Sequence, residues 1–149
     1  IRSSRIDQVA AVTEEMLMNA IYDAPVDHSG RPLFNSLPRT EKVHLGPGQY
    51  GRLSYATDGM FMGVSVTDPF GSLEGRVILD YLESCYSGQA GTLNKNKGGA
   101  GRGLHMIIEM SDLVVFNIEP KVRTEIIALF NLDLKSSDNW STSFHYFYK

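Results

Sequence analysis

A run of closely spaced glycines is the segment of this sequence best suited to bind an anion. Residues 96–104 read Asn-Lys-Gly-Gly-Ala-Gly-Arg-Gly-Leu, and the apolar spacing of Leu104, Ile107 and Ile108 predicts a helix that follows at once. Glycine has no Cβ, so its backbone can approach a bulky group, and the free N–H groups of a helix's first turn attract anions. Phosphate is the natural ligand, but a flexible connection that is merely rich in glycine would explain this segment equally well.

A stripe of carboxylate and amide side chains on a predicted helix is the second candidate. Apolar residues recur at helical spacing over Ile6–Ala20, and Pro25 ends the helix. Glu15, Asn19 and Asp23 follow at intervals of four residues, so we expect them on one helix face. An amide oxygen suits Mg²⁺, which prefers oxygen ligands. Asp23 is better explained as a solvated residue or a partner of the helix end.

An aspartate at the end of a predicted strand is the third candidate. Alternation in the segment Phe61–Thr67 places Asp68 on the same face as Val64 and Val66. A carboxylate on a buried face is costly unless a donor bonds to it. Asp68 therefore either binds a ligand or caps the turn that follows the strand.

The remaining pattern predicts the elements that position these residues. We expect a hairpin of Tyr50–Ala56 and Phe61–Thr67 around an Asp58-Gly59 turn of the favoured type, and a helix that Ser72 caps. That helix carries Leu73, Val77, Tyr81 and Cys85, and it is followed by a loop over 88–101 and strands at Leu113–Ile118, Thr124–Leu132 and Ser141–Tyr148. Residues 24–50 read as irregular. The order predicts an α+β protein, a two-layer α/β sandwich whose mostly antiparallel mixed sheet has helices on one face.

Composition sets the broad class of the protein. The 149 residues fit one domain, 1–149, and the net charge of −3 gives no sign of nucleic-acid or acidic-membrane binding. No apolar run approaches the roughly 18 residues of a membrane span. The single cysteine, Cys85, fits a cytoplasmic location. Because the sequence begins at Ile1, we expect a fragment or a processed chain.

Taken in order, the three candidates resemble the ATP-binding domains of the histidine-kinase, gyrase and Hsp90 superfamily. That family carries E-x-x-x-N-A on a helix, which matches Glu15-Met16-Leu17-Met18-Asn19-Ala20. A strand then supplies an aspartate, matching Asp68, and G-x-G-x-G-L matches Gly99-Ala100-Gly101-Arg102-Gly103-Leu104. The resemblance covers about residues 15–129.

The resemblance implies an ATP site with Mg²⁺. Asn19 would hold the Mg²⁺, Glu15 would act as the catalytic residue that orients or deprotonates the nucleophile, and Asp68 would accept from the adenine amino group. The glycine segment would close the phosphate site, and Gly71 would be a cofactor-binding residue at the adenine end, where the family carries D-x-G-x-G. This chain departs there, with Asp68-Pro69-Phe70-Gly71-Ser72. Arg102 either reaches a phosphate or faces solvent. Lys95 and Lys97 likewise either contact the γ-phosphate or belong to a solvated loop.

The short chain is most similar in size to the serine kinases that act on anti-sigma-factor systems. This implies a cytoplasmic serine/threonine protein kinase in signal transduction that transfers the ATP γ-phosphate to a regulatory protein of anti-anti-sigma or sigma-factor type. The alternative is a catalytically inactive module that senses nucleotide or binds a protein. Both allow a homodimer, and neither involves nucleic acid or a membrane.

Overall fold

The computed structural model describes residues 3–86, 100–133 and 141–149. Within these ranges the chain forms three α-helices, one π-helical turn and five strands. Their order is α1 (Ser3–Met18), η1 (Asn19–Asp23), β1 (Arg52–Thr57), β2 (Phe61–Asp68), α2 (Gly75–Tyr86), α3 (Ala100–Met110), β3 (Leu113–Glu119), β4 (Arg123–Asn131) and β5 (Ser143–Tyr148). None of the helices in these ranges is both long and apolar enough to cross a membrane.

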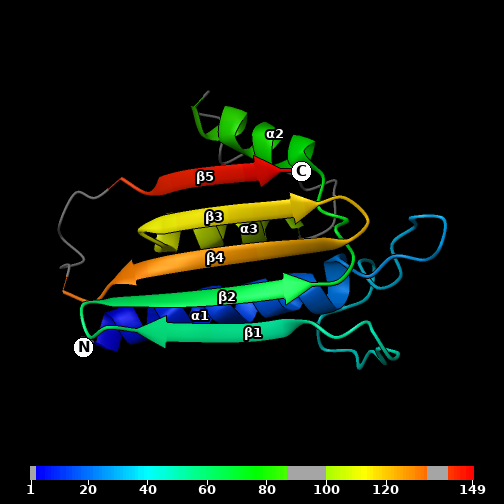
Figure 1. The fold of residues 1–149 in the computed structure, drawn as a ribbon, viewed down its shortest axis with the longest axis horizontal. Coiled ribbons are helices and arrows are strands. Elements are labelled where there is room, and N and C mark those ends of the chain that lie inside the picture. Colours follow the sequence, from blue (N-terminus) through cyan, green and yellow to red (C-terminus); the bar gives the residue numbers. More distant parts are fainter. Residues whose placement is uncertain (1–2, 87–99, 134–140) are drawn as a thin grey trace.

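The strands form one mixed sheet in the spatial order β1-β2-β4-β3-β5 (Figure 1). Three neighbouring pairs are antiparallel, and β5 lies parallel to β3. The central pair, β2 with β4, runs in register from Phe61 opposite Asn131 to Asp68 opposite Thr124. The predicted α+β class and the largely antiparallel sheet are confirmed.

Helices α1 and α3 cover one face of this sheet and lie behind it in Figure 1. Alternate residues of the three central strands point to that face and are buried, as the two-residue period of a strand requires. The helices meet them with apolar residues at helical spacing. The resulting core contains Val12, Met16, Ala20, Val64, Val66, Ile78, Tyr81, Leu104, Ile107, Ile108, Val114, Phe116, Ile118, Ile126, Ala128 and Phe130. This arrangement is compatible with a two-layer α/β sandwich.

A buried ion pair fixes the first turn of α1. The Arg5 guanidinium donates to Asp112 Oδ1 at 3.1 Å, and both side chains are about nine-tenths buried. The other oxygen, Asp112 Oδ2, accepts from the backbone N–H of Asn131 at 2.6 Å. The pair therefore joins the start of α1 to the segment before β3 and to the end of β4.

The β1–β2 connection is longer than the predicted two-residue turn. It comprises Asp58, Gly59 and Met60, and only Gly59 has a positive φ, of 93°. Asp58 Oδ1 accepts from the N–H groups of Met60 and Phe61 at 2.9 and 2.7 Å. These bonds select a three-residue turn, because the favoured two-residue type needs a positive φ at both central residues.

The prediction that Ser72 caps the next helix is wrong. α2 begins at Gly75, and the Ser72 hydroxyl donates instead to the backbone carbonyl of Ala24 at 2.7 Å. That bond attaches the segment after β2 to the end of η1. Leu73 consequently lies before the helix, where it lines a cavity described below. The side chain of Cys85 lies outside the described residues.

Gly71 lets the segment after β2 pack directly on the β3–β4 turn. It has φ +57°, and an added Cβ would overlap the carbonyl oxygen of Glu119 and lie 2.8 Å from the backbone nitrogens of Lys121 and Val122. The Lys121 N–H also donates to the Gly71 carbonyl at 3.1 Å. Lys121 itself has φ 62°, which is uncommon for a residue with a Cβ. Only glycine fits at position 71.

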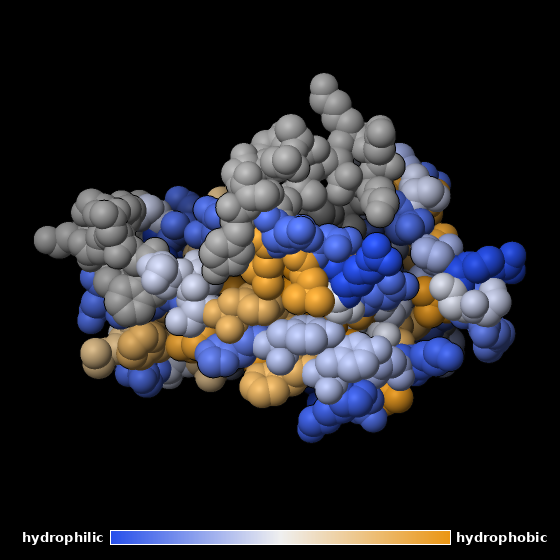
Figure 2. Space-filling view, turned by 90° about the horizontal axis from the view of Figure 1, so that it is seen from above, coloured by the Kyte–Doolittle hydropathy of each residue, from blue (hydrophilic) through white to orange (hydrophobic). Residues whose placement is uncertain are grey.

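β5 supports the start of α2. The Tyr146 hydroxyl lies so close to Gly75 that an added Cβ there would overlap it, and Phe144 of the same strand packs on Phe116 with ring centroids 5.5 Å apart. Figure 2 looks onto the edge formed by α2 and β5 and shows apolar residues gathered in the middle of that face. The exposed large hydrophobic residues of these two elements are Val77, Leu79, Phe147 and Tyr148.

Substitution of Gly71 by alanine tests this packing. We expect Gly71→Ala to lower the free energy of unfolding by about 3 kcal/mol or more, because a strained φ and a backbone overlap add together. Gly59→Ala is the matched control: it has a positive φ with no atom near its added Cβ, so it should cost only about 1–2 kcal/mol. Urea denaturation measures both, and equal losses would contradict the close contact.

Candidate functional site

The stripe of Glu15, Asn19 and Asp23 begins on α1 and continues through η1. Burial of Val12 and Met16, both fully inaccessible, turns the neighbouring face of the helix toward the irregular segment 24–51. The Ala24 N–H donates to the Asn19 carbonyl at 2.8 Å, a five-residue interval that marks the π-helical turn. The helix was predicted to be regular as far as Pro25. Single π turns of this kind are frequent at functional sites.

Arg39 of the irregular segment binds all three members of this stripe. Its Nη1 donates to Glu15 Oε1 and Oε2 at 2.8 and 2.9 Å. Its Nη2 donates to Asp23 Oδ2 at 3.1 Å and lies 3.5 Å from Asn19 Oδ1. The sequence gives no sign of this role for Arg39, because no spacing rule connects a loop residue to a helix face 16–24 positions earlier.

The pKa of Asp23 reflects this environment. Burial raises the pKa of the carboxyl group above its ordinary value, while the charge of Arg39 acts in the opposite direction and that of Glu15 adds to the increase. Asp23 is therefore neither a solvated residue nor a simple helix-end partner, as the sequence suggested. It belongs to the ion-pair cluster.

Asp68 caps the turn that follows β2. Its side chain is almost completely buried, and Oδ1 accepts from the N–H groups of Phe70 and Gly71 at 2.9 and 3.3 Å. Burial raises the pKa of Asp68, and these two donors together with Thr124 oppose the increase. Since the turn uses Oδ1, Oδ2 is left for other donors such as Thr124 or a ligand amine. The two sequence hypotheses for Asp68, capping and binding, are thus compatible.

Thr124 is a second polar residue at this end of the site. It lies opposite Asp68 in the β2–β4 register and is 2% exposed. It is near enough to lower the pKa of Asp68, yet its hydroxyl oxygen is buried without a hydrogen bond of standard geometry to any described residue. Such an atom is costly to bury and favours a bound water or ligand. In the sequence, Thr124 could have been recognised as a polar residue at a buried position near the start of β4.

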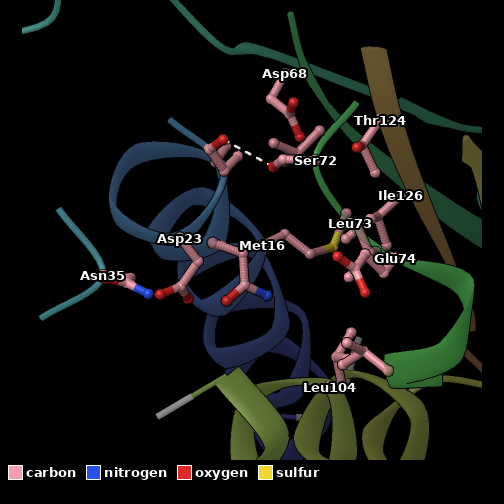
Figure 3. Close-up of a pocket in the computed structure, with 15 residues that line it drawn as sticks. Met16, Asp23, Asn35, Asp68, Ser72, Leu73, Glu74, Leu104, Thr124 and Ile126 are labelled. Atoms are coloured by element: carbon pink, nitrogen blue, oxygen red, sulfur yellow. Dashed lines mark hydrogen bonds between the residues drawn. The ribbon is translucent and has the colours of Figure 1, made fainter. Parts of the chain in front are cut away.

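Asn19, Asp68 and Leu104 meet at one cavity of about 330 Å³, although they come from η1, β2 and α3. Figure 3 shows Asp68 and Thr124 at one end and Leu104 at the other. The lining is mostly apolar and comprises Met16, Asn19, Ala20, Asp23, Ala24, Asn35, Val66, Asp68, Ser72, Leu73, Glu74, Val77, Leu104, Thr124 and Ile126. The volume falls in the range of roughly 300–1,000 Å³ that is typical of ligand pockets.

The other predicted site residues are placed differently. Gly101, Gly103 and Leu104 already belong to α3, which starts at Ala100, so the predicted loop does not extend to Gly101. An added Cβ at Gly103 would overlap Glu15 Oε1, which makes Gly103 the point where α3 approaches α1. Glu15, Gly71 and Gly103 are not among the described residues that line the cavity. Gly99, Lys95, Lys97 and the side chains of Ala100 and Arg102 lie outside the described residues.

No family model, curated protein or solved structure matches this chain. The interpretation of the site therefore depends on its geometry and on the motif resemblance.

The side-chain oxygens beside the cavity are suitable ligands for Mg²⁺, provided that Arg39 does not occupy them. Glu15, Asn19 and Asp23 supply only oxygen atoms, which is what Mg²⁺ prefers. Each of these side chains is engaged by the Arg39 guanidinium, however, so a metal ion and Arg39 cannot use the same oxygens together. Among the described residues there is also no cluster of three or more His, Cys, Asp or Glu arranged to hold a metal. Asn19 could thus contribute one ligand, with the others supplied by water and a bound phosphate.

The raised pKa of Asp68 predicts a distinct effect of pH on stability. The native protein keeps the Asp68 proton to a higher pH than the unfolded chain does, so ionisation of Asp68 reduces stability above its native pKa. This cost vanishes as the pH falls below the unfolded value near 3.8. Asp68→Asn retains an oxygen for the turn, so it should raise the free energy of unfolding at neutral pH, with a gain that shrinks in acid.

Asp58→Asn is the opposite control. Backbone donors lower the pKa of Asp58, so its charged form stabilises the native state above the unfolded pKa, and that contribution is lost as the pH falls. Asp58→Asn should therefore destabilise the protein at neutral pH, with a difference that also closes in acid. Urea denaturation over the pH range measures both variants, and a loss of stability in Asp68→Asn at neutral pH would contradict the assignment.

A double-mutant cycle tests the contact between Gly103 and Glu15. Alanine normally stabilises a helix interior over glycine by roughly 0.5–1 kcal/mol. We expect Gly103→Ala instead to destabilise the protein by about 1 kcal/mol, because it displaces a carboxylate that Arg39 holds. In a Glu15→Ala background the same substitution should become stabilising. Stabilisation by Gly103→Ala in both backgrounds would show that the two residues do not meet.

Proposed function

We propose that this chain is an ATP-binding regulatory domain with the fold of the histidine-kinase-like ATPases. The observation that supports the proposal is that Asn19, Asp68 and Leu104, which match three separate motifs of that family, line a single cavity. A mixed sheet with helices on one face is compatible with such a fold. The cavity is therefore the main support for this function.

The buried end of the cavity suits adenine. Asp68 provides an acceptor in an apolar setting, and an exocyclic amine is its natural partner; guanine presents a carbonyl oxygen at the corresponding position. The buried hydroxyl of Thr124, beside Asp68, offers a further donor or acceptor. The side chains of Val66 and Ile126 supply apolar contacts from the sheet.

The opposite end would take the phosphates. Asn19 would contribute an oxygen ligand to Mg²⁺, which supplies charge neutralisation when it is bound. Glu15 would accept the proton of an attacking serine or threonine hydroxyl, and the segment Gly99–Gly103 would donate backbone N–H groups. Phosphoryl transfer needs this kind of positioning and electrostatic stabilisation more than it needs covalent chemistry.

On this proposal the protein is a cytoplasmic serine/threonine kinase of the anti-sigma-factor type that modifies a regulatory protein partner. The second candidate, an inactive module that senses nucleotide or binds a protein, is favoured by one observation. Arg39 donates to both oxygens of the Glu15 carboxylate, so neither oxygen is free to accept from a substrate hydroxyl in this state. With either function, the exposed apolar residues of α2 and β5 would offer a surface for a protein partner.

Mg-ATP should stabilise the chain if the cavity binds nucleotide. At a concentration one hundred times Kd, binding adds about 2.7 kcal/mol to the free energy of unfolding, which raises Tm by several degrees. Asn19→Ala should reduce the shift with Mg-ATP and leave the shift with adenosine unchanged, whereas Asp68→Asn should reduce both. Thermal unfolding of the wild type that is unaffected by adenosine and by Mg-ATP would refute the nucleotide site.

Transfer of radiolabelled phosphate from ATP to partner proteins separates the two candidate functions. Transfer that Glu15→Ala abolishes identifies the kinase. Nucleotide binding without transfer to any partner identifies the module.

A further inference from the structure

The guanidinium of Arg39 binds three acceptors beside the cavity. Arg39 forms ion pairs with Glu15 and Asp23 at 2.8 and 3.1 Å, and its own side chain is 31% exposed. A single positive charge is therefore shared between two carboxylates, and the cluster retains excess negative charge when both are ionised. The side chains of Glu15 and Asp23 are 15% and 22% exposed, so water can reach both carboxylates when the guanidinium moves away. Partly exposed ion pairs are less costly to break than fully buried ones.

The backbone at Arg39 is held independently of its side chain. The Tyr22 hydroxyl lies 3.0 Å from the Arg39 carbonyl oxygen and 2.6 Å from that of Glu41, so its one proton donates to this pair of acceptors. Tyr22 is buried in η1, on the same helical segment as Asp23. The guanidinium can consequently change partners while the chain at residues 39–41 stays in place.

The cavity beside this cluster lacks a positive charge of its own. Three of its described lining residues are acidic, namely Asp23, Asp68 and Glu74, and none of the described lining residues is basic. An anionic ligand would meet these carboxylates unless a cation accompanied it. Arg39 contacts two of the lining residues, Asn19 and Asp23, so its guanidinium is at the margin of the cavity.

We propose that Arg39 is the phosphate-binding residue of this cavity, and that its guanidinium exchanges the carboxylates of Glu15 and Asp23 for phosphate oxygens of a bound nucleotide. The inference rests on the proposed nucleotide-binding function and adds a residue from outside all the motifs. A guanidinium recognises carboxylate and phosphate with the same paired N–H geometry, so the exchange replaces like with like.

The exchange has a consequence for Glu15. In the present arrangement Arg39 Nη1 donates to both oxygens of this carboxylate. Once the guanidinium moves to a phosphate, both oxygens become free. Phosphate binding and the availability of Glu15 as a base are thereby coupled through one side chain.

A ligand series tests the inference on the full chain. Calorimetric titrations with adenosine, AMP, ADP and ATP, each with Mg²⁺ and with a chelator, should show affinity that increases with the number of phosphates. Arg39→Ala should weaken ATP binding by about 10-fold to 100-fold, as expected for loss of a hydrogen-bonded charge pair, and leave adenosine binding unchanged. Arg39→Lys should fall between, because an ammonium group cannot form the paired contact.

Arg31→Ala is the matched control. Arg31 belongs to the same irregular segment, pairs only with Asp27 among the described salt bridges and is strongly exposed, so its removal should not alter ATP affinity. If Arg39→Ala does not fold, Arg39→Gln retains part of the side chain and one N–H donor group without the charge, and a loss of ATP affinity is expected there too. NMR signals of the Arg39 side-chain N–H groups should shift on addition of ATP and remain unchanged with adenosine.

The outcomes separate this inference from the function on which it rests. Wild-type protein that binds neither adenosine nor ATP overturns both. Wild-type protein that binds both ligands, with ATP affinity equal or higher in Arg39→Ala and Arg39→Gln, overturns only the role of Arg39. Arg39 signals that do not move when ATP binds have the same meaning.

Discussion

The burial of one stripe of α1 against the sheet is the constraint on which the rest of the structure depends. Val12 and Met16 are completely enclosed, and the Arg5–Asp112 pair fixes the first turn of the same helix. A helix held at its start and along one face cannot rotate, so the direction of every other side chain on it is determined. The polar stripe must then face the margin of the cavity, where Asn19 joins its lining.

At the margin of the cavity, one positive charge is shared among several acceptors. Two carboxylates and an amide share one guanidinium, and α3 comes close enough that its third residue after Ala100 must lack a side chain. Each group is held by the others, so a ligand that attracts any one of them changes the state of all. The cluster combines the properties of a structural support and of a binding site, which is common where polar groups are enclosed.

Periodicity predicted the elements of this fold well, because the alternation in β2, β3 and β4 and the spacing in α1 directly reflect burial. It failed where a side chain bonds to a remote backbone. Ser72 is a residue type that often caps helices, but its hydroxyl binds the Ala24 carbonyl. Nothing in the sequence around Arg39 indicates that it binds Asp23. The requirement for glycine at position 71 is likewise visible only in three dimensions, because Gly71 packs on the Glu119 carbonyl.

The contact between Tyr146 and Gly75 links the last strand to a wall of the cavity. That wall includes Leu73, Glu74 and Val77. The first residue of α2, Gly75, lies between them and contacts the Tyr146 hydroxyl of β5. β5 is one of the two edge strands of the sheet, and among the described residues it pairs with β3 alone. A displacement of β5 would therefore shift the start of α2 and, with it, this wall of the cavity.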